Sequence, residues 1–245
     1  MIRIDDHGEV RLITLDRPEA LNAFDSPLYF AAAAALDDAR ADDGVKVVVL
    51  TAEGRAFSAG QDLKEMARLA AGEAIESGFP ALLDALGRFD KPLVAAVNGL
   101  GIGIGFTILP HCDLVYVSSQ ARFRVPFAEL GVPPEAASSL LFPARMGWQR
   151  AAKVLFTSDW VTAEEAVEWG LALEVLELDA LVPTALEVAQ RIASAPLAAL
   201  VAIKSAMLAG RADAVAAARA HEEAAFAELL TSAATREALD DFGTS

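Results

Sequence analysis

Two glycine-rich stretches constrain the fold of this chain more than any other feature of its sequence. Residues 54–63 follow an apolar run at 45–50, and residues 99–105 follow a second apolar run at 93–97. Each apolar run has the pattern of a buried strand, and each glycine-rich stretch leads from that strand toward an expected helix. The two glycine-rich stretches lie about one βα unit apart in the sequence. A junction of this kind leaves main-chain N–H groups unpaired, where they can bind an anion or a developing oxyanion. Two such junctions facing each other would make a site.

Composition indicates a globular protein. The 245 residues fit one large domain, or one domain with a small appendage. The chain is 54% hydrophobic and 22% charged, which is not the composition of a disordered protein. Its net charge of −15 argues against nucleic acid as a partner, because phosphate binding needs a basic face.

The sequence predicts a cytoplasmic protein without a membrane span. Cys112 is the single cysteine, so it cannot form an intramolecular disulfide and is expected to be a small core residue in a reducing compartment. The first residues lack the apolar core of a signal peptide. Residues 92–110 are uncharged, but Asn98, the glycines and the flanking prolines favour a buried strand, turn and helix over a membrane span.

Hydrophobic periodicity predicts an α/β core followed by helices alone. Ser26 and Pro27 form a favourable helix start, and Thr162 with Glu165 forms a capping box. Strands are expected at 10–15, 46–51, 93–97, 113–118 and 172–176; helices are expected at 26–43, 63–71, 77–89, 103–109, 138–146, 148–156, 162–170, 179–194, 196–209, 213–231 and 233–241.

The glycines at 99, 101, 103 and 105 do not form a nucleotide-binding motif. A dinucleotide fingerprint needs glycine at 104 or 106, where the chain has Ile104 and Phe106. A phosphate-binding P-loop also needs a Gly-Lys-Ser/Thr sequence, which follows neither Gly54 nor Gly60. Alternate glycines indicate backbone packed closely against a neighbouring helix or a ligand.

A serine hydrolase is a weaker interpretation. Ser58 lies in a segment one residue short of the nucleophile-elbow motif, and its downstream histidines are His111 and His221. His111 follows a proline at an expected helix end, and His221 lies in mid-helix among charges. Neither these histidines nor His7 has metal-ligand spacing, so the sequence predicts no metal site.

Several linked motifs resemble the crotonase (enoyl-CoA hydratase/isomerase) superfamily. They are residues 15–23, 56–63 and 91–105, the pair Cys112-Asp113, and residues 155–170. The resemblance implies a spiral core of ββα turns at 1–190 and a C-terminal helical region at 191–245 that builds a homotrimer or a dimer of trimers. It also implies an acyl-CoA thioester as substrate, with coenzyme A as part of the substrate and no other cofactor.

The same resemblance implies the binding residues. The oxyanion hole would consist of the N–H groups of Gln61 and Ile104. The family usually has glycine at the second position, where this chain has Ile104. Because the donor is a main-chain N–H, the isoleucine side chain is expected to change the shape of the pocket more than it changes the donor. Coenzyme A would lie along Ala23, Ala59, Asp62 and Leu63.

The carboxylates indicate which reaction follows. Family members that add water have glutamates at the positions of Thr107 and Phe127, which are expected here to line the acyl pocket. The remaining carboxylate, Glu135, follows Pro126-Phe127 in a segment similar to that of the peroxisomal-type Δ3,Δ2-enoyl-CoA isomerases. The resemblance therefore implies Glu135 as the catalytic acid/base.

The residues around Glu135 support this interpretation independently. Pro133 and Pro134 stiffen the approach, and residues 136–139 are small, so a carboxylate held among them should have a raised pKa. The alternative is a glutamate that stabilises the N-terminus of the helix at 138.

The sequence thus predicts an isomerase that shifts a 3,4 double bond of an acyl-CoA to the 2,3 position. Other possibilities are a different crotonase-family reaction (a hydratase, a ring isomerase or a hydrolase) and a CoA-binding protein without catalysis.

Overall fold

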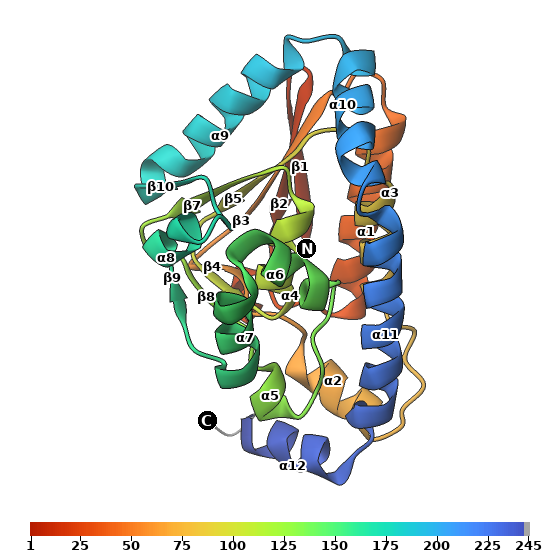
Figure 1. The fold of residues 1–245 in the computed structure, drawn as a ribbon. Helices are drawn as coiled ribbons and strands as arrows, with labels where there is room; N and C mark the ends of the chain where they lie inside the picture. Colours follow the sequence, from red (N-terminus) through yellow and green to blue (C-terminus); the bar gives the residue numbers. More distant parts are fainter. Residues whose placement is uncertain (243–245) are drawn as a thin grey trace.

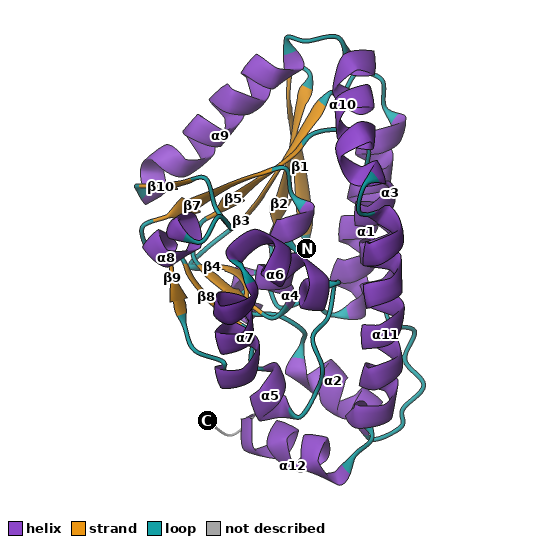
Figure 2. Ribbon diagram, viewed as in Figure 1, coloured by secondary structure: helices purple, strands orange, loops and turns teal. Residues whose placement is uncertain are grey.

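Two β-sheets of unequal size organise residues 1–242, the part of the chain that the computed structural model describes (Figures 1 and 2). The larger sheet has the strand order β1-β2-β3-β5-β7-β10, in which β1 is antiparallel to β2 and all other neighbours are parallel. Its strands are β1 (Ile2–His7), β2 (Val10–Leu15), β3 (Val47–Ala52), β5 (Leu93–Val97), β7 (Leu114–Ser118) and β10 (Glu174–Leu176).

The smaller sheet has the order β4-β6-β8-β9. Its strands are β4 (Ala56–Ser58), β6 (Leu100–Ile102), β8 (Arg122–Arg124) and β9 (Val161–Thr162). The chain passes from the larger sheet to the smaller one three times in succession, through β3–β4, β5–β6 and β7–β8, and a helix follows each time. This repeat is the spiral of ββα turns that the sequence motifs implied.

The sequence analysis missed β1 and all four strands of the smaller sheet. These four strands are two or three residues long, too short to show an alternating pattern, and their partners come from distant parts of the chain. The expected strands of the larger sheet are confirmed. Residues 10–15 and 93–97 match β2 and β5 at both ends.

The described helices lie within a few residues of their predicted positions, except α5, which was not predicted. They are α1 (Ser26–Ala41), α2 (Leu63–Ala70), α3 (Phe79–Arg88), α4 (Ile104–Thr107), α5 (Phe127–Leu130), α6 (Ser138–Met146), α7 (Trp148–Thr157), α8 (Ala163–Glu168), α9 (Leu178–Ala193), α10 (Leu197–Ala209), α11 (Ala212–Leu230) and α12 (Ala233–Phe242). The capping box of Thr162 and Glu165 is present. The predicted N-cap of α1 is wrong, because Asp25 accepts the hydrogen bond from Leu28 N and Ser26 begins the helix.

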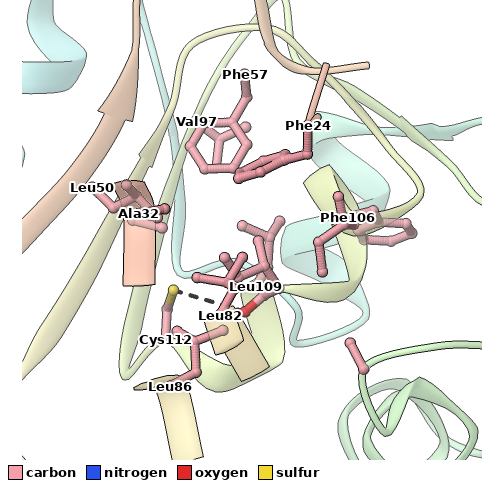
Figure 3. Close-up of a cluster of buried hydrophobic side chains, with 14 of the residues drawn as sticks. Phe24, Ala32, Leu50, Phe57, Leu82, Leu86, Val97, Phe106, Leu109 and Cys112 are labelled. Atoms are coloured by element: carbon pink, nitrogen blue, oxygen red, sulfur yellow. Dashed lines mark hydrogen bonds between the residues drawn. The ribbon is translucent and has the colours of Figure 1, made fainter. Parts of the chain in front are cut away.

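The main core lies between one face of the larger sheet and helices α1 and α3 (Figures 1 and 3). Helix α9 covers the opposite face, where Leu181 and Ala185 pack against Val47 and Val94. Cys112 is buried in the main core as predicted, and burial raises the pKa of its thiol to about 12. The thiol therefore stays protonated and serves as packing.

The uncharged stretch at 92–110 forms β5, β6 and α4 in the protein interior, with a short turn of 3-10 helix (Leu109–His111) after them. Among residues 1–242, no single helix is both long enough and apolar enough to cross a membrane. The pair α9 and α10 meets that test together but is bent by 106°.

A buried lysine ties the C-terminal helices to the sheet. Lys204 of α10 is 5% exposed. Its Nζ donates to the Lys91 carbonyl at 2.8 Å and to Asp113 Oδ2 at 2.9 Å. Asp113 Oδ2 also accepts a hydrogen bond from Leu93 N at 2.7 Å, and the Phe89 ring lies 5.1 Å from the ammonium. One carboxylate thus connects β5 with α10.

We expect Lys204→Met to lower the free energy of unfolding by about 2–4 kcal/mol, because the change leaves Asp113 without its cation in a partly buried position. Urea unfolding followed by circular dichroism measures the effect. The exposed neighbour Ser205→Ala serves as the control and should leave the urea midpoint within experimental error. A Lys204→Met midpoint equal to that of Ser205→Ala would contradict this role.

Candidate active site

The two glycine-rich junctions meet at Gly60 and Gly103. Both glycines have left-handed backbone, with φ of +93° and +52°. A Cβ on Gly60 would lie 2.9 Å from the Ile102 carbonyl oxygen, and one on Gly103 would lie 3.6 Å from the Gly60 Cα. At Gly60 both the lack of space and the positive φ require glycine, whereas at Gly103 the space admits a Cβ and only the positive φ favours glycine. The contact brings the residues that follow, Gln61 and Ile104, onto neighbouring segments.

The main-chain N–H groups of Gln61 and Ile104 are suited to bind an oxyanion. Around Gln61, Phe24 N donates to Gly60 O at 2.7 Å and Asp62 N donates to Phe24 O at 2.8 Å, so the strand-like pairing leaves out the Gln61 N–H. Ile104 is the first residue of α4, where an N–H has no acceptor within the helix. Two such donors on adjacent segments can stabilise negative charge on one oxygen.

Glu135 faces this pair of junctions. Its Oε1 lies 3.6 Å from the position that a Cβ on Gly103 would occupy, and Thr107 Oγ1 donates a hydrogen bond to it at 3.5 Å. The residue as a whole is partly exposed. Desolvation, and secondly the Glu222 carboxylate, raise the pKa of Glu135 to about 8, while the Thr107 hydrogen bond opposes the rise. An acid with this pKa can exchange protons near neutral pH.

A different carboxylate stabilises the helix that follows Glu135. Glu222 of α11 accepts hydrogen bonds from Ala137 N at 2.7 Å and from Ser139 N at 2.9 Å, at the N-terminus of α6. The alternative role for Glu135, stabilising this helix end, therefore belongs to Glu222. The sequence analysis missed Glu222, because it lies mid-helix more than 80 residues away and no local motif marks it.

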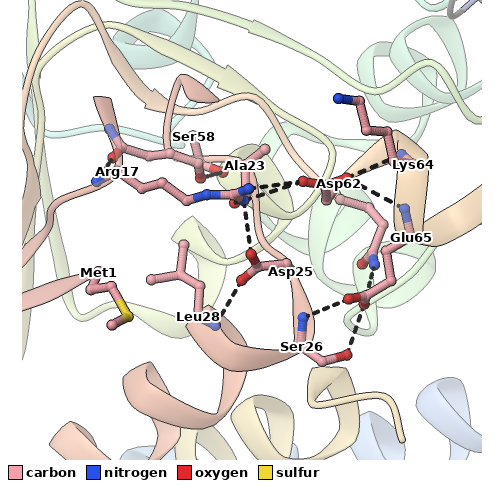
Figure 4. A network of polar contacts seen from close by, with 12 residues as sticks. Met1, Arg17, Ala23, Asp25, Ser26, Leu28, Ser58, Asp62, Lys64 and Glu65 are labelled. Atoms are coloured by element: carbon pink, nitrogen blue, oxygen red, sulfur yellow. Dashed lines mark hydrogen bonds and ion pairs between the residues drawn. The ribbon is translucent and has the colours of Figure 1, made fainter. Parts of the chain in front are cut away.

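The residues expected to contact coenzyme A lie on two adjacent segments (Figure 4). Ala59 N donates to the Leu21 carbonyl at 2.9 Å, which holds residues 21–24 beside residues 59–62. The four residues in question, Ala23, Ala59, Asp62 and Leu63, are all partly exposed. The Asp62 carboxylate caps α2 and pairs with Arg17, so its side chain already has partners. We call these four residues the CoA rim; apart from Asp62, they offer a ligand only backbone groups and apolar side chains.

Thr107 and Phe127, the two residues expected to line the acyl pocket, have different surroundings. Thr107 is buried and contacts Glu135. Phe127 instead lines an apolar groove of about 310 Å³ whose lining does not include Thr107. The lining residues come from α5, α6, α7 and the loops between them: Phe127, Ala128, Val132, Pro134, Ser139, Pro143, Trp148, Ala151, Ala152, Leu155 and Phe156.

The alternate glycines pack against protein. A Cβ on Gly105 would lie 2.5 Å from the Ser58 carbonyl oxygen, and one on Gly101 would lie 2.8 Å from the Phe123 ring. Their close neighbours are thus the strands β4 and β8, where the sequence analysis had proposed a helix or a ligand. Gly103 differs, since a Cβ there would face the Glu135 carboxylate.

Ser58 has a structural role in this arrangement. Its buried Oγ donates to the Asn22 carbonyl at 2.8 Å and accepts a hydrogen bond from Gly60 N at 3.1 Å. His111 Nε2 instead contacts the Ala136 carbonyl at 2.8 Å, and His221 is exposed on α11. Neither histidine hydrogen bonds to Ser58, so the serine-hydrolase arrangement is not formed.

A buried network that the sequence analysis did not anticipate holds the Gln61 side chain. Tyr29 Oη donates to Gln61 Oε1 at 2.8 Å, and Gln61 Nε2 donates to Glu65 Oε1 at 3.3 Å. Burial raises the pKa of Tyr29 well above its ordinary value, with smaller contributions from Glu135 and Glu65. The phenol therefore remains a donor, and the network holds the side chain of Gln61, one of the two candidate oxyanion-binding residues.

Comparisons with known proteins agree with this architecture. The family model described as enoyl-CoA hydratase/isomerase matches residues 5–243. The 2,3-dehydroadipyl-CoA hydratase of Escherichia coli is 33% identical over 233 residues, which cover 95% of this chain and 91% of the relative. Enoyl-CoA delta isomerase 2 of Rattus norvegicus is 39% identical over 179 residues, which cover 71% of this chain and 46% of that longer protein.

A solved structure has the same fold. The crystal structure of an enoyl-CoA hydratase/isomerase from Pseudoalteromonas atlantica superposes with a TM-score of 0.94 at 36% identity, covering 99% of this chain and 96% of that chain. The relatives include both a hydratase and an isomerase, so similarity alone does not distinguish the two reactions. With the family model matched almost from end to end, the chain belongs to the enoyl-CoA hydratase/isomerase (crotonase) family.

Proposed function

We propose that the protein is an acyl-CoA isomerase that moves a double bond from the 3,4 to the 2,3 position, with Glu135 as the single acid/base. One observation carries the proposal. A carboxyl group with a raised pKa lies against the glycine that precedes Ile104, while Thr107 and Phe127 occupy the positions where hydrating members of the family have glutamates.

The proposed reaction begins with the thioester oxygen bound between the N–H groups of Gln61 and Ile104. Glu135 removes a proton from C2, and the electron pair of that C–H bond delocalises through the adjacent double bond and the carbonyl. The resulting dienolate carries its negative charge on the oxygen held by the two N–H groups. The protonated Glu135 then returns the proton to C4, which leaves the double bond between C2 and C3.

One carboxyl group suffices for this reaction, because the proton removed at C2 and the proton delivered at C4 are chemically equivalent. Hydration needs a further group to orient the water molecule that attacks C3. Thr107 is buried and hydrogen bonds to Glu135, and Phe127 is apolar, so neither can serve as a second carboxylate. This difference favours isomerisation, although the similar proteins include a hydratase.

The raised pKa of Glu135 fits the role of a base for a carbon acid. An ordinary carboxylate is too weak a base to remove a C2 proton efficiently, and base strength increases with pKa. With a pKa of about 8, Glu135 is closer in pKa to the C2–H group of the thioester than an ordinary carboxyl group is. It can still ionise near neutral pH. Coenzyme A would lie along the rim formed by Ala23, Ala59, Asp62 and Leu63, and no other cofactor is needed.

We expect Glu135→Gln to lower isomerase turnover by about 10²–10⁴-fold, since the amide has the size of the carboxyl group but cannot accept the C2 proton. The assay incubates 3-enoyl-, 2-enoyl- and aromatic acyl-CoAs with the protein in deuterated water, then locates the label. Glu129→Gln is the matched control, because Glu129 is an exposed glutamate of the preceding helix. Turnover of Glu135→Gln within a few-fold of the control would overturn the assignment.

The same assay separates the alternatives. Formation of 3-hydroxyacyl-CoA from the 2-enoyl substrate would identify a hydratase. Binding of acyl-CoA without C2 exchange in the unmodified protein would identify a CoA-binding protein that lacks catalysis.

The pKa of Glu135 also predicts a dependence of stability on pH. Because its pKa is raised from 4.5 to about 8, the folded protein binds this proton more tightly than the unfolded chain. The contribution of Glu135 to stability is therefore full below pH 4.5, falls as the pH rises, and is lost above pH 8. Glu135→Gln should become more stable relative to the parent by roughly 2–4 kcal/mol between pH 5 and pH 9. Urea unfolding of both proteins at the two pH values measures the change, and a pH-independent difference would contradict the raised pKa.

We also propose that the C-terminal region predicted at 191–245, of which residues 243–245 lie outside the described part of the chain, is the region through which the protein assembles as a homotrimer or a dimer of trimers. Helix α10 is apolar except for Lys204 and Ser205, yet Lys204 is its single fully buried residue. Ile203 and Met207 are 59% and 67% exposed, and such surface usually marks an interface.

Light scattering is expected to give three or six times the mass of the 25.8 kDa chain. Ile203→Glu should shift the population toward smaller species, because it would bury a charge in that interface. A monomeric parent protein, or an assembly that Ile203→Glu does not weaken, would contradict the proposal.

A further inference from the structure

We propose that Glu222 of α11 is a positioning residue for Glu135: it holds the segment 135–139 in the conformation that presents Glu135 to the two main-chain donors. The inference rests on the proposed function, since it concerns the acid/base of that reaction. It adds a residue from the C-terminal helices to a site otherwise built by the spiral core.

Glu222 is a buried side chain that hydrogen bonds to the segment after Glu135. Its side chain is 3% exposed. Oε2 accepts a hydrogen bond from Ala137 N at 2.7 Å, and Oε1 accepts one from Ser139 N at 2.9 Å and another from the Ser139 hydroxyl. Both carboxylate oxygens are thus bound to the segment that begins with Glu135. The N-terminus of α6 needs such a partner, because Ala137 in the N-cap position has no side-chain acceptor.

The backbone of this segment requires restraint. Ala136 and Ala137 have φ of +57° and +58°. Residues other than glycine and asparagine rarely adopt this left-handed conformation, and two alanines in succession adopt it only where surrounding contacts impose it. Glu222 supplies those contacts on one side, through Ala137 and Ser139.

His111 supplies a contact on the other side. Its Nε2 lies 2.8 Å from the Ala136 carbonyl, which can only accept a hydrogen bond, so Nε2 carries the proton. Burial lowers the pKa of His111 to about 4, which keeps the ring neutral at physiological pH. The two left-handed alanines are thus held from α11 and from the segment after α4.

The negative charge of Glu222 also acts on Glu135. Among the described residues, Thr107 of α4 donates a hydrogen bond to Glu135, and Tyr29 of α1 and Glu222 of α11 interact with it electrostatically. The ion pairs among the described side chains do not include Glu222, and the nearby Arg219 pairs with Asp84 and Glu223. An unpaired carboxylate next to Glu135 disfavours ionisation of Glu135 and so strengthens it as a base.

Three substitutions separate these effects. Glu222→Gln removes the charge and one of the two acceptor oxygens. Glu222→Asp keeps the charge but is too short to reach both N–H groups. Glu223→Gln is the matched control, because Glu223 is the exposed neighbour on the same helix.

For Glu222→Gln we expect kcat to fall roughly 10- to 100-fold with KM within about threefold of the parent, because the base is misplaced while the CoA rim is intact. The inflection of the kcat–pH profile should move to lower pH. For Glu222→Asp, kcat should fall while the inflection stays near the parent value. Hydrogen exchange of the 136–139 amides should accelerate in both variants and remain unchanged in Glu223→Gln.

A folded Glu222→Gln protein with parental kcat, pH inflection and amide exchange would overturn the proposal. A kcat that falls only in proportion to the folded fraction, with the inflection unmoved, would assign Glu222 a purely structural role and also overturn it. If Glu222→Gln does not fold, Glu222→Asp provides the same amide-exchange measurement. Amide exchange needs no substrate, so failure of the isomerase assignment, seen as an active Glu135→Gln, is distinguishable from failure at Glu222.

Discussion

The site depends on the close approach of two main-chain segments at Gly60 and Gly103. A side chain at Gly60 would collide with the Ile102 carbonyl, and one at Gly103 would come into contact with the Glu135 carboxylate and with Gly60. The approach sets the N–H groups of Gln61 and Ile104 on adjacent segments. It is supported by Gly105, which lets α4 pack against the Ser58 backbone, and by the bonds of Ser58 to Asn22 and Gly60. These contacts hold the two candidate donor segments together.

The surroundings of Glu135, the proposed acid/base, lower the stability of the folded protein. Its carboxyl group is desolvated and experiences the charge of the Glu222 carboxylate. The two residues that follow it, Ala136 and Ala137, have left-handed backbone conformation. Each condition is unfavourable for the folded state. Together they raise the pKa of the group and direct it toward Gly103, which are the properties that the proposed proton transfer needs. The rigid core on both faces of the larger sheet supplies the stability that offsets them.

Two buried charged side chains of the C-terminal helices, Lys204 and Glu222, contact the core. Lys204 of α10 binds Asp113 and the Lys91 carbonyl, and so fixes the helices against the larger sheet. Glu222 of α11 binds the start of α6, directly after the segment that bears Glu135. Helix α12 packs near α2 and α5 at the lower end of the molecule in Figure 1. The proposed assembly surface lies on α10, and the next helix, α11, contacts the segment that bears the proposed acid/base.

The sequence by itself determined the strands of the larger sheet other than β1 and nearly all the helices, and it supplied the candidate site residues. Apolar periodicity located β2 and β5, caps located α8, and linked motifs identified Gln61, Ile104 and Glu135, because each of these signals lies within a short stretch of chain. Tertiary structure alone decided the smaller sheet, whose strands have two or three residues, and the division of Thr107 and Phe127 between two environments. It also decided the roles of Tyr29, Lys204 and Glu222. These depend on partners far away in the chain, and a side chain buried by such a partner leaves no local pattern in the sequence.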